Sequence, residues 1–348
     1  MPKYFKITLY TIFSVIVLTA GFFLWAAVAE YCPKAVELID ENHTAQEVAD
    51  EFIITTWNIG YAGMNAETDF FMDGGKQTNT TKEQTQINMR NILTTLDTLS
   101  ADFILLQEVD EISKRSYFIN QFGQIAESMP DCHLSKAYNF KTVFVPIPIT
   151  NPLGKVQAGI ATLSKRAPIK AERYAYPNAT PLPNRLFDLK RCFMASEYKT
   201  HNNNNLYIIN THNSAFDSGE NRKKEMECLR ELLESLYCQG AYVIVGGDWN
   251  QLPPDYPTEP TTPQYTPYRI IKDMLPDGWK VVYDQSVETV RFANEPYAKG
   301  RTLTATVDFF LISPNVEALY VKAYPLEFRH SDHNPVSAKF KLTQLCDN

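Results

Sequence analysis

Several predicted β-strands of this chain end in a carboxylate, amide or imidazole side chain that the strand pattern does not require. The residues at strand ends are Asn58, Glu108, His212, Asp248 followed by Asn250, and Asp308, and Ser331-Asp332-His333 precede the last strand. One such residue alone is usually a hydrogen-bonded structural side chain or a turn former. Carboxylates and amide oxygens also bind hard divalent cations, and aspartate and histidine transfer protons. The repetition predicts that these side chains meet in one site that combines a metal ion with acid–base chemistry.

The elements that would position these side chains are short strands with a few helices between them. Apolar residues recur with three-and-four spacing over residues 89–99 and 226–236, which predicts an amphipathic helix in each segment. Strands are predicted at residues 52–59, 103–106, 159–163, 191–198, 206–210, 242–245, 307–312, 318–323 and 336–342. Alternating prolines and tyrosines over residues 253–267 predict a long irregular connection. Many strands with a few helices predict packed sheets flanked by helices.

The composition predicts one globular catalytic domain over residues 51–348, since 44% of the chain is hydrophobic and no Gly/Ser-rich linker divides its interior. A formal net charge of −7 counts against a stable nucleic-acid partner, because such binding draws on many lysine and arginine contacts to phosphates. The 6 cysteines lack any CxxC spacing, which argues against a structural zinc site. Their even number permits disulfides without requiring them.

The N-terminal segment, residues 1–29, is predicted to be a transmembrane anchor or a signal peptide. Lys3 and Lys6 precede an uncharged stretch from Ile7 to Ala29 that is long enough to cross a bilayer as a helix. Ala27-Val28-Ala29 also fits a signal-peptide cleavage site. The two lysines favour a cytoplasmic N-terminus, and residues 30–50 form an acidic linker. We therefore expect a membrane-anchored protein with an extracytoplasmic catalytic domain, or a secreted or periplasmic protein if the segment is cleaved.

Short motifs occur in a fixed order along the predicted domain. They are WNIG at Trp57–Gly60, LLQEVD at Leu105–Asp110, INTH at Ile209–His212, GGDWN at Gly246–Asn250, VDFFLIS at Val307–Ser313 and SDHNPV at Ser331–Val336. This ordered set, from about Phe52 to Leu342, resembles the endonuclease/exonuclease/phosphatase superfamily. The resemblance implies an α/β (α+β) four-layer sandwich, in which two packed, mainly antiparallel β-sheets are flanked by helices. It also implies hydrolysis of phosphate esters with a divalent cation, usually Mg²⁺.

The metal ligands expected from this resemblance are oxygen donors. Glu108 and Asn58 supply a carboxylate and an amide carbonyl, a sparse site in which Mg²⁺ keeps several waters and takes another ligand from substrate. Asp332 is expected to contribute directly or through a water. Mn²⁺ is an alternative ion, and a second metal held by Asp248 stays open.

The remaining residues are expected to perform the hydrolysis. By resemblance, Asp248 orients and deprotonates the attacking water, and Asn250, two residues further along an extended segment, donates to a phosphoryl oxygen. An Asx turn is the structural alternative for this pair. His333 would stabilise the transition state, with Asp308 fixing its ring, and His212 resembles a phosphate-contacting histidine of the nuclease and sphingomyelinase branches.

Arginines and an acidic loop are further candidates for the contact with substrate. Arg115, Arg191 and the segment Asp73-Gly74-Gly75 could touch a substrate phosphate or head group. Arginines of this kind more often are solvated or pair with carboxylates.

Three functions agree with these residues. The first is a Mg²⁺-dependent phosphodiesterase or phosphatase acting on a phospholipid or another small phosphoester, with the membrane as partner through the N-terminal segment. The second is a nuclease acting on DNA or RNA, which would be expected to carry a basic groove. The third is a catalytically inactive binding module, which would be expected to lack Glu108, Asp248 or His333, and all three are present.

Overall fold

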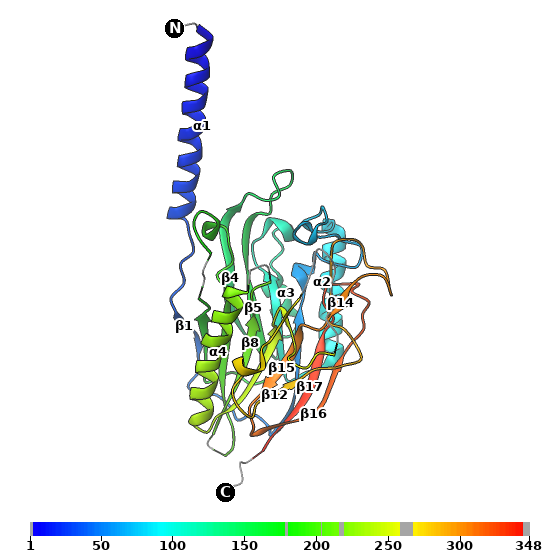
Figure 1. The fold of residues 1–348 in the computed structure, drawn as a ribbon. Helices are drawn as coiled ribbons and strands as arrows, with labels where there is room; N and C mark the ends of the chain where they lie inside the picture. The colour runs from blue at the N-terminus through cyan, green and yellow to red at the C-terminus, as the bar shows by residue number, and fades with distance from the viewer. Residues whose placement is uncertain (1–2, 178–179, 203, 216–218, 258–266, 344–348) are drawn as a thin grey trace.

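The protein is a two-sheet sandwich with a long N-terminal helix projecting from one end (Figure 1). The computed structural model describes residues 3–177, 180–202, 204–215, 219–257 and 267–343. The central part of the irregular connection expected at residues 253–267 lies outside the described residues. Short 3₁₀ turns lie at Gly60–Ala62, Phe71–Asp73, Lys114–Ser116, Asn184–Leu186 and Lys272–Met274.

One sheet has seven strands in the order β1-β6-β7-β8-β9-β15-β12. Their bounds are β1 Val36–Glu41, β6 Lys170–Ala175, β7 Cys192–Lys199, β8 Asn205–His212, β9 Tyr242–Asp248, β15 Asp308–Ile312 and β12 Lys280–Val282. Neighbouring strands are antiparallel except β8 and β9, which are parallel.

The other sheet has six strands in the order β16-β17-β2-β3-β5-β4. Their bounds are β16 Val316–Ala323, β17 Val336–Leu342, β2 Glu51–Asn58, β3 Phe103–Asp110, β5 Gly154–Ser164 and β4 His133–Val145. Only β2 and β3 are parallel here. Two small pairs, β10 Gln251–Leu252 with β11 Tyr268–Arg269 and β13 Val290–Arg291 with β14 Thr304–Ala305, lie beside the sandwich.

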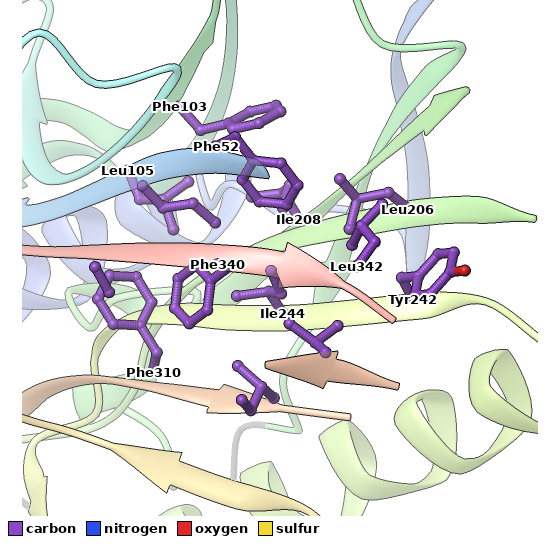
Figure 2. Packing of buried hydrophobic residues seen from close by; sticks show 14 of the residues in the cluster. Phe52, Phe103, Leu105, Leu206, Ile208, Tyr242, Ile244, Phe310, Phe340 and Leu342 are labelled. Carbon is purple, nitrogen blue, oxygen red and sulfur yellow. The ribbon is translucent and has the colours of Figure 1, made fainter. Parts of the chain in front are cut away.

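The two sheets bury their facing surfaces against each other. Phe103 and Phe340 of the six-stranded sheet and Ile208, Ile244 and Phe310 of the seven-stranded sheet belong to one fully buried cluster (Figure 2). Alternate residues of these strands point into this core, and the residues between them point to the outer face of their sheet. This core fixes the position of one sheet relative to the other, so residues at the strand ends of the two sheets are also fixed relative to one another.

Helices cover the two outer faces. The predicted amphipathic helices are α2 Lys82–Leu99, which packs with α3 Gln121–Ser128 on the six-stranded sheet, and α4 Glu220–Cys238, which packs on the seven-stranded sheet. Thr81 accepts a hydrogen bond from the Gln84 N–H and caps α2. The four-layer sandwich expected from the sequence is confirmed.

Each sheet contains one parallel pair, and this feature positions the site. Strands β2 and β3, and likewise β8 and β9, run in the same direction, so both members of a pair end at the same edge. These four strands end at or near Asn58, Glu108, His212 and Asp248. Strand β15 runs antiparallel to β9 with Asp308 opposite Asp248, so it begins at that edge.

Residues 30–50, expected to be an acidic linker, are a structured part of the domain. They include β1, which pairs antiparallel with β6 at the edge of the seven-stranded sheet. Val48 is only 6% exposed and belongs to the core between the sheets. The sequence did not predict this strand, because its acidic composition is not typical of a strand. Its side chains are exposed or half-buried at a sheet edge.

Helix α1, Lys3–Val28, is the one helix among the described residues that is long and apolar enough to cross a membrane. Most of its side chains are exposed, and Ala26 near its end is the buried exception. The described cysteines, Cys32, Cys132, Cys192, Cys228 and Cys238, are free thiols.

Candidate active site

A cavity of about 540 Å³ opens where the parallel strand pairs end. All of the site residues predicted from sequence except Asp308 line it: Asn58, Glu108, His212, Asp248, Asn250, Asp332 and His333. Asp308 is fully buried behind His333. Side chains from Asn58, at the end of β2, to His333, just before the last strand β17, thus meet in one cavity.

A backbone irregularity in β3 directs Glu108 into this cavity. The pairing of β3 with β5 shifts register between Leu106 and Val109, and Glu108 adopts a left-handed φ of 54°. Arg115 Nη1 lies 3.7 Å from the Glu108 carboxylate. Burial raises the pKa of Glu108, Arg115 opposes this rise, and the nearby Asp332 adds to it. Two carboxylates facing one hydrated cavity form a site that favours a cation.

Asn58 positions the neighbouring carboxylates. Its Nδ2 donates to Asp248 Oδ2 at 2.9 Å and approaches Glu108 Oε1 at 3.4 Å. Its Oδ1 accepts the Gly60 N–H at 3.0 Å. The amide oxygen expected to bind metal therefore already has a backbone donor, and the amide nitrogen faces the carboxylates. This geometry gives Asn58 a positioning contact that the sequence did not reveal.

Gly60 allows Asp332 to approach the same corner. Gly60 has φ of 48°, and a Cβ at this position would lie 2.7 Å from Asp332 Oδ1. Any larger residue would therefore push the carboxylate away. Ser331 Oγ donates to the Asn58 carbonyl oxygen at 2.7 Å and ties this segment to the end of β2.

Asp248 and Asn250 form a turn rather than an extended segment. The Asn250 N–H donates to Asp248 Oδ1 at 2.9 Å, and Asn250 has φ of 49°. The extended geometry predicted for this pair is wrong, because β9 ends at Asp248 and an Asx turn follows. Both side chains still line the cavity. The Asn250 amide donates to the Asn213 carbonyl oxygen at 2.9 Å, which fixes its orientation.

His333 forms the predicted contact with Asp308. Its Nδ1 lies 2.8 Å from Asp308 Oδ2, and its Nε2 lies 3.8 Å from Asp248 Oδ2. Trp57 Nε1 donates to the His333 carbonyl oxygen at 2.9 Å. Burial alone would lower the pKa of His333, but Asp308 and Asp248 outweigh it and raise the pKa to about 10. The ring is therefore an imidazolium at neutral pH.

His212 differs from His333 in that its ring is neutral. Its Nδ1 lies 3.4 Å from the Asn139 amide and its Nε2 lies 3.5 Å from Asp248 Oδ2. Burial holds the pKa of His212 well below its usual range, and the positive charges of Arg191, His333 and Arg115 lower it further. A neutral ring with Asn139 on one nitrogen can donate its other N–H toward the cavity.

The donor set fits a divalent cation at Glu108 and Asp332. A second group, Asp248, Asp308 and His333, has candidate ligand atoms within 4.8 Å of one another. In that group His333 Nδ1 is hydrogen-bonded to Asp308, and a second metal held there by Asp248 stays a proposal. Burial raises the pKa of Asp248, and His333 opposes this rise. The carboxylates of Glu108 and Asp332 are hard oxygen donors that line the same cavity and suit a hard divalent cation.

The remaining walls are cationic and apolar. Arg115 and Arg191, both candidates from sequence, line the cavity together with Arg222 and Arg291, which carry no motif. Arg191 Nη1 is buried without a hydrogen-bond partner among the described residues. Asp73 also lines the cavity. Burial raises its pKa to about 6, although the Ala293 N–H opposes this.

The comparisons with known proteins agree with this architecture. No curated protein matches the chain. The endonuclease/exonuclease/phosphatase from Beutenbergia cavernae DSM 12333 has a TM-score of 0.59 at 16% identity, over 85% of this chain and 72% of that one. TDP2 from D. rerio, solved with a single-strand DNA product, has a TM-score of 0.54 at 13% identity, over 84% of this chain and 100% of that one. ANGEL2, described as a 2′,3′-cyclic phosphatase and solved with adenosine-2′,3′-vanadate, has a TM-score of 0.55 at 15% identity, over 90% of this chain and 100% of that one.

At 13–16% identity these solved structures show only that the fold is shared. The family assignment rests on the match of the sequence to a family model. The model of the Endonuclease/Exonuclease/phosphatase family matches residues 55–333, a span that runs from β2 to His333 and contains every predicted site residue. The chain belongs to the endonuclease/exonuclease/phosphatase family.

Proposed function

We propose that this protein is a Mg²⁺-dependent hydrolase of phosphoester bonds. The observation that carries the proposal is a buried carboxylate beside a histidine that a second carboxylate holds, both at one cavity. Asp248 is 1% exposed and receives hydrogen bonds from Asn58 and Asn250, while His333, held by Asp308, lies beside it. This pairing supplies a base and a cationic donor within reach of one phosphate.

In the proposed reaction Asp248 accepts a proton from a water molecule as the water oxygen attacks phosphorus. The bond between phosphorus and the leaving oxygen breaks, the leaving oxygen takes up a proton from solvent to become an alcohol, and Asp248 returns the proton from the attacking water to solvent. The imidazolium of His333 and the neutral N–H of His212 donate to the phosphoryl oxygens, where negative charge accumulates. Asn250 lies in the same cavity, with its amide oriented by Asn213.

Glu108 and Asp332 are the residues that would hold Mg²⁺, or Mn²⁺ as the alternative. A bound divalent cation there would neutralise charge on the phosphate and polarise the phosphorus–oxygen bond. Asn58 would keep Glu108 and Asp248 apart through its amide, since it approaches both carboxylates.

A small phosphoester is the favoured substrate class. TDP2 and ANGEL2 were solved with a DNA product and a nucleotide vanadate, so phosphate chemistry agrees with this fold. The chain here has a net charge of −7, which disfavours a long polyanion held along an exposed surface. Arg191 in the cavity wall, whose buried Nη1 has no hydrogen-bond partner among the described residues, instead favours a compact anionic group.

We also propose that α1 anchors the protein with its domain outside the cytoplasm. Lys3 and Lys6 precede the apolar stretch, and acidic residues follow it between Glu30 and Glu51. Only the last turns of α1 contact the domain, which leaves the rest of the helix available to lipid.

The test is hydrolysis by the purified full chain in detergent with Mg²⁺. Substrates would be bis-p-nitrophenyl phosphate, inositol phosphates, sphingomyelin and plasmid DNA. We expect release of product from at least one small phosphoester, loss of the reaction with EDTA and recovery with Mg²⁺. Cleavage of DNA alone would favour the nuclease alternative, and inactivity on every substrate by a folded protein would overturn the proposal.

A further inference from the structure

The base of α1 is attached to the segment that forms one wall of the cavity. Phe22 stacks on Phe187 with 5.8 Å between ring centroids, and Phe22 also contacts Phe144 at 6.4 Å. Just beyond the helix, Glu30 pairs with Lys190 at 2.7 Å and with Arg185 at 3.2 Å. Phe187, Asp188, Leu189 and Arg191 of this same segment line the cavity. The apolar helix and the active site are therefore joined through a few residues.

The length of α1 determines the level in the bilayer at which the helix contacts the segment around Phe187. A helix of 26 residues spans about 39 Å at about 1.5 Å per residue, whereas the hydrocarbon core of a bilayer is about 30 Å thick. The turns that contact the domain, at Phe22 and Ala26, are the last of the helix, so they fall at the membrane–water interface. The segment that they contact lies at the same level, and so does that side of the cavity.

The loop between β4 and β5 adds an exposed apolar surface at this end of the molecule. It projects from the end of the sandwich at which α1 leaves the domain (Figure 1). No Asp, Glu, Lys or Arg occurs between Lys141 and Lys155. Ile149 is 90% exposed and Ile147 is 47% exposed. Exposed apolar tips flanked by lysines suit the interface of a bilayer with anionic lipids.

The cavity interior continues this apolar character. Beside the phosphate-binding groups it is lined by Phe70, Phe71, Phe140, Val145, Ile147 and Leu153. Ile147 belongs both to this wall and to the exposed loop, so the apolar surface runs from the cavity to the loop. A free sugar phosphate or an inorganic phosphate would leave this wall in contact with water, whereas a lipid would cover it.

We infer that the substrate is a phosphoester lipid drawn from the bilayer in which α1 is anchored, with the β4–β5 loop in contact with the membrane surface. The inference rests on the proposed hydrolase activity and adds the substrate class and its direction of entry. The lipid phosphate would reach His333 and the metal-binding carboxylates while its apolar part stays beside Phe140 and Leu153. Water attacks phosphorus, one phosphorus–oxygen ester bond of the lipid breaks, and the leaving oxygen takes up the proton.

The experiment compares a dissolved and a membrane-embedded ester for the same enzyme. The full chain is reconstituted into vesicles of phosphatidylcholine that contain, in turn, phosphatidylglycerol, phosphatidylethanolamine, phosphatidylinositol or sphingomyelin. Hydrolysis of these lipids is measured beside hydrolysis of dissolved bis-p-nitrophenyl phosphate. The variants are Ile149→Asp in the β4–β5 loop, 90% exposed, and Leu182→Asp in the β6–β7 connection, 60% exposed and three residues before Arg185, which pairs with Glu30. Neither position lines the cavity. Leu319→Asp, 42% exposed and in the middle of β16 in the six-stranded sheet, is the matched control outside both loops.

We expect the wild type to hydrolyse at least one bilayer lipid, and Ile149→Asp to reduce that rate about tenfold, with the dissolved ester hydrolysed at the wild-type rate. Leu182→Asp should act in the same direction, and Leu319→Asp should leave both rates unchanged. Hydrolysis of the dissolved ester with no hydrolysis of any bilayer lipid would overturn the inference and keep the proposed activity. Equal lipid hydrolysis by wild type and both loop variants would also overturn it. Inactivity on both kinds of ester would count against the proposed function itself.

Discussion

Asp248 and His333 combine a buried negative charge and a buried positive charge that support each other. Asp248 Oδ2 and His333 Nε2 are 3.8 Å apart, so one phosphoryl oxygen or water on the cavity side of the pair can contact both atoms. A lone buried charge is costly, and here each group is compensated by a partner and by hydrogen bonds. Both groups are therefore already in position before substrate binds, Asp248 to accept a proton and His333 to donate a hydrogen bond.

Replacing either residue should stop turnover without unfolding the protein. We expect Asp248→Asn or His333→Ala to lower kcat by about a hundredfold or more, since each removes a base or a charge-stabilising donor. Steady-state rates on bis-p-nitrophenyl phosphate, beside circular dichroism melting curves, provide the measurement. A variant that keeps near-normal kcat would remove its residue from the mechanism.

Arg191 should act on substrate binding more than on the chemical step. Its Nη1 is buried in the cavity wall with no hydrogen-bond partner among the described residues. A phosphate oxygen there would satisfy it through a charge-assisted bond. We expect Arg191→Gln to raise KM about tenfold with a smaller change in kcat, and Arg191→Lys to restore part of the affinity. Arg90→Gln, at an exposed position of α2, is the control, and an unchanged KM for Arg191→Gln would exclude the contact.

At this scale the acidic and imidazole residues named from sequence do line the cavity, except Asp308 behind His333, whereas only two of its four arginines were named. Asp248 and His333 lie in short motifs at strand ends, where a polar residue is conspicuous. Arg222 lies within α4 and Arg291 in the short strand β13, so only tertiary packing brings them to the cavity. The Asx turn at Asn250 was an alternative in the sequence, but its left-handed backbone was not evident.

At the scale of secondary-structure elements, the turn that follows β2 determines the position of Asp332. A Cβ on Gly60 would lie 2.7 Å from Asp332 Oδ1. We expect Gly60→Ala to raise the Mg²⁺ concentration needed for half-maximal activity about tenfold, because the carboxylate must move away. Gly300→Ala is the matched control, since Gly300 also has a positive φ, of 76°, with nothing within 4 Å of the added Cβ.

Both glycine variants should lose about 1 kcal/mol of stability from backbone strain. Only Gly60→Ala should change the dependence on Mg²⁺. Equal Mg²⁺ activation curves for the two variants would show that Asp332 does not hold the ion.

The end of β3 carries a second polar cluster, and this one governs stability at acid pH. Glu111 accepts a hydrogen bond from Lys136 Nζ at 2.6 Å and also contacts Tyr138 and Gln157 of the β4–β5 hairpin. Burial alone would raise the pKa of Glu111, but the bonds from Lys136 and Tyr138 outweigh it and lower the pKa. A lowered pKa in the folded state means that the carboxylate stabilises the fold above its unfolded pKa and that this contribution is lost as the pH falls through the folded value.

Glu111→Gln should therefore destabilise the protein by about 1 kcal/mol at pH 7. The difference in melting temperature between wild type and variant should shrink as the pH falls below about 4. Thermal melts across this range give the measurement. A constant difference at all pH values would show that charge on Glu111 plays no part.

Many of the strands and the helices α2 and α4 followed from sequence periodicity, whereas the strands β1, β4, β6 and β12 and the irregularity of β3 did not. Strand β1 is acidic and lies at a sheet edge, so it lacks the alternation of a half-buried strand. The irregularity of β3 at Glu108 depends on pairing with β5, which no local pattern encodes. Both depend on contacts between distant segments, and local sequence signals do not report such contacts.

For the whole molecule, β1 and the residues between it and residue 51 contact the part of the chain that begins at residue 51. Besides the β1–β6 pairing, the Val48 N–H donates to the Lys199 carbonyl oxygen at 2.9 Å, and the Asn42 N–H donates to that of Ile169 at 2.8 Å. A chain that begins at Glu51 removes all of these contacts and exposes the edge of β6. Net values of about 1 kcal/mol for a hydrogen bond and about 2 kcal/mol for burial of a valine make this loss substantial.

We expect a chain beginning at Glu51 to be about 3 kcal/mol less stable than one beginning at Glu30, with a melting temperature lower by roughly 6 °C. A third chain, beginning at Ala35, keeps β1 but lacks Glu30 and its pairs with Lys190 and Arg185. If the strand accounts for the effect, this third chain should melt close to the chain from Glu30, because partly exposed ion pairs contribute little. Coincident melting of the chains from Glu30 and Glu51 would instead place residues 30–50 outside the cooperative fold. Since all three lack α1, the differences among them report the domain alone.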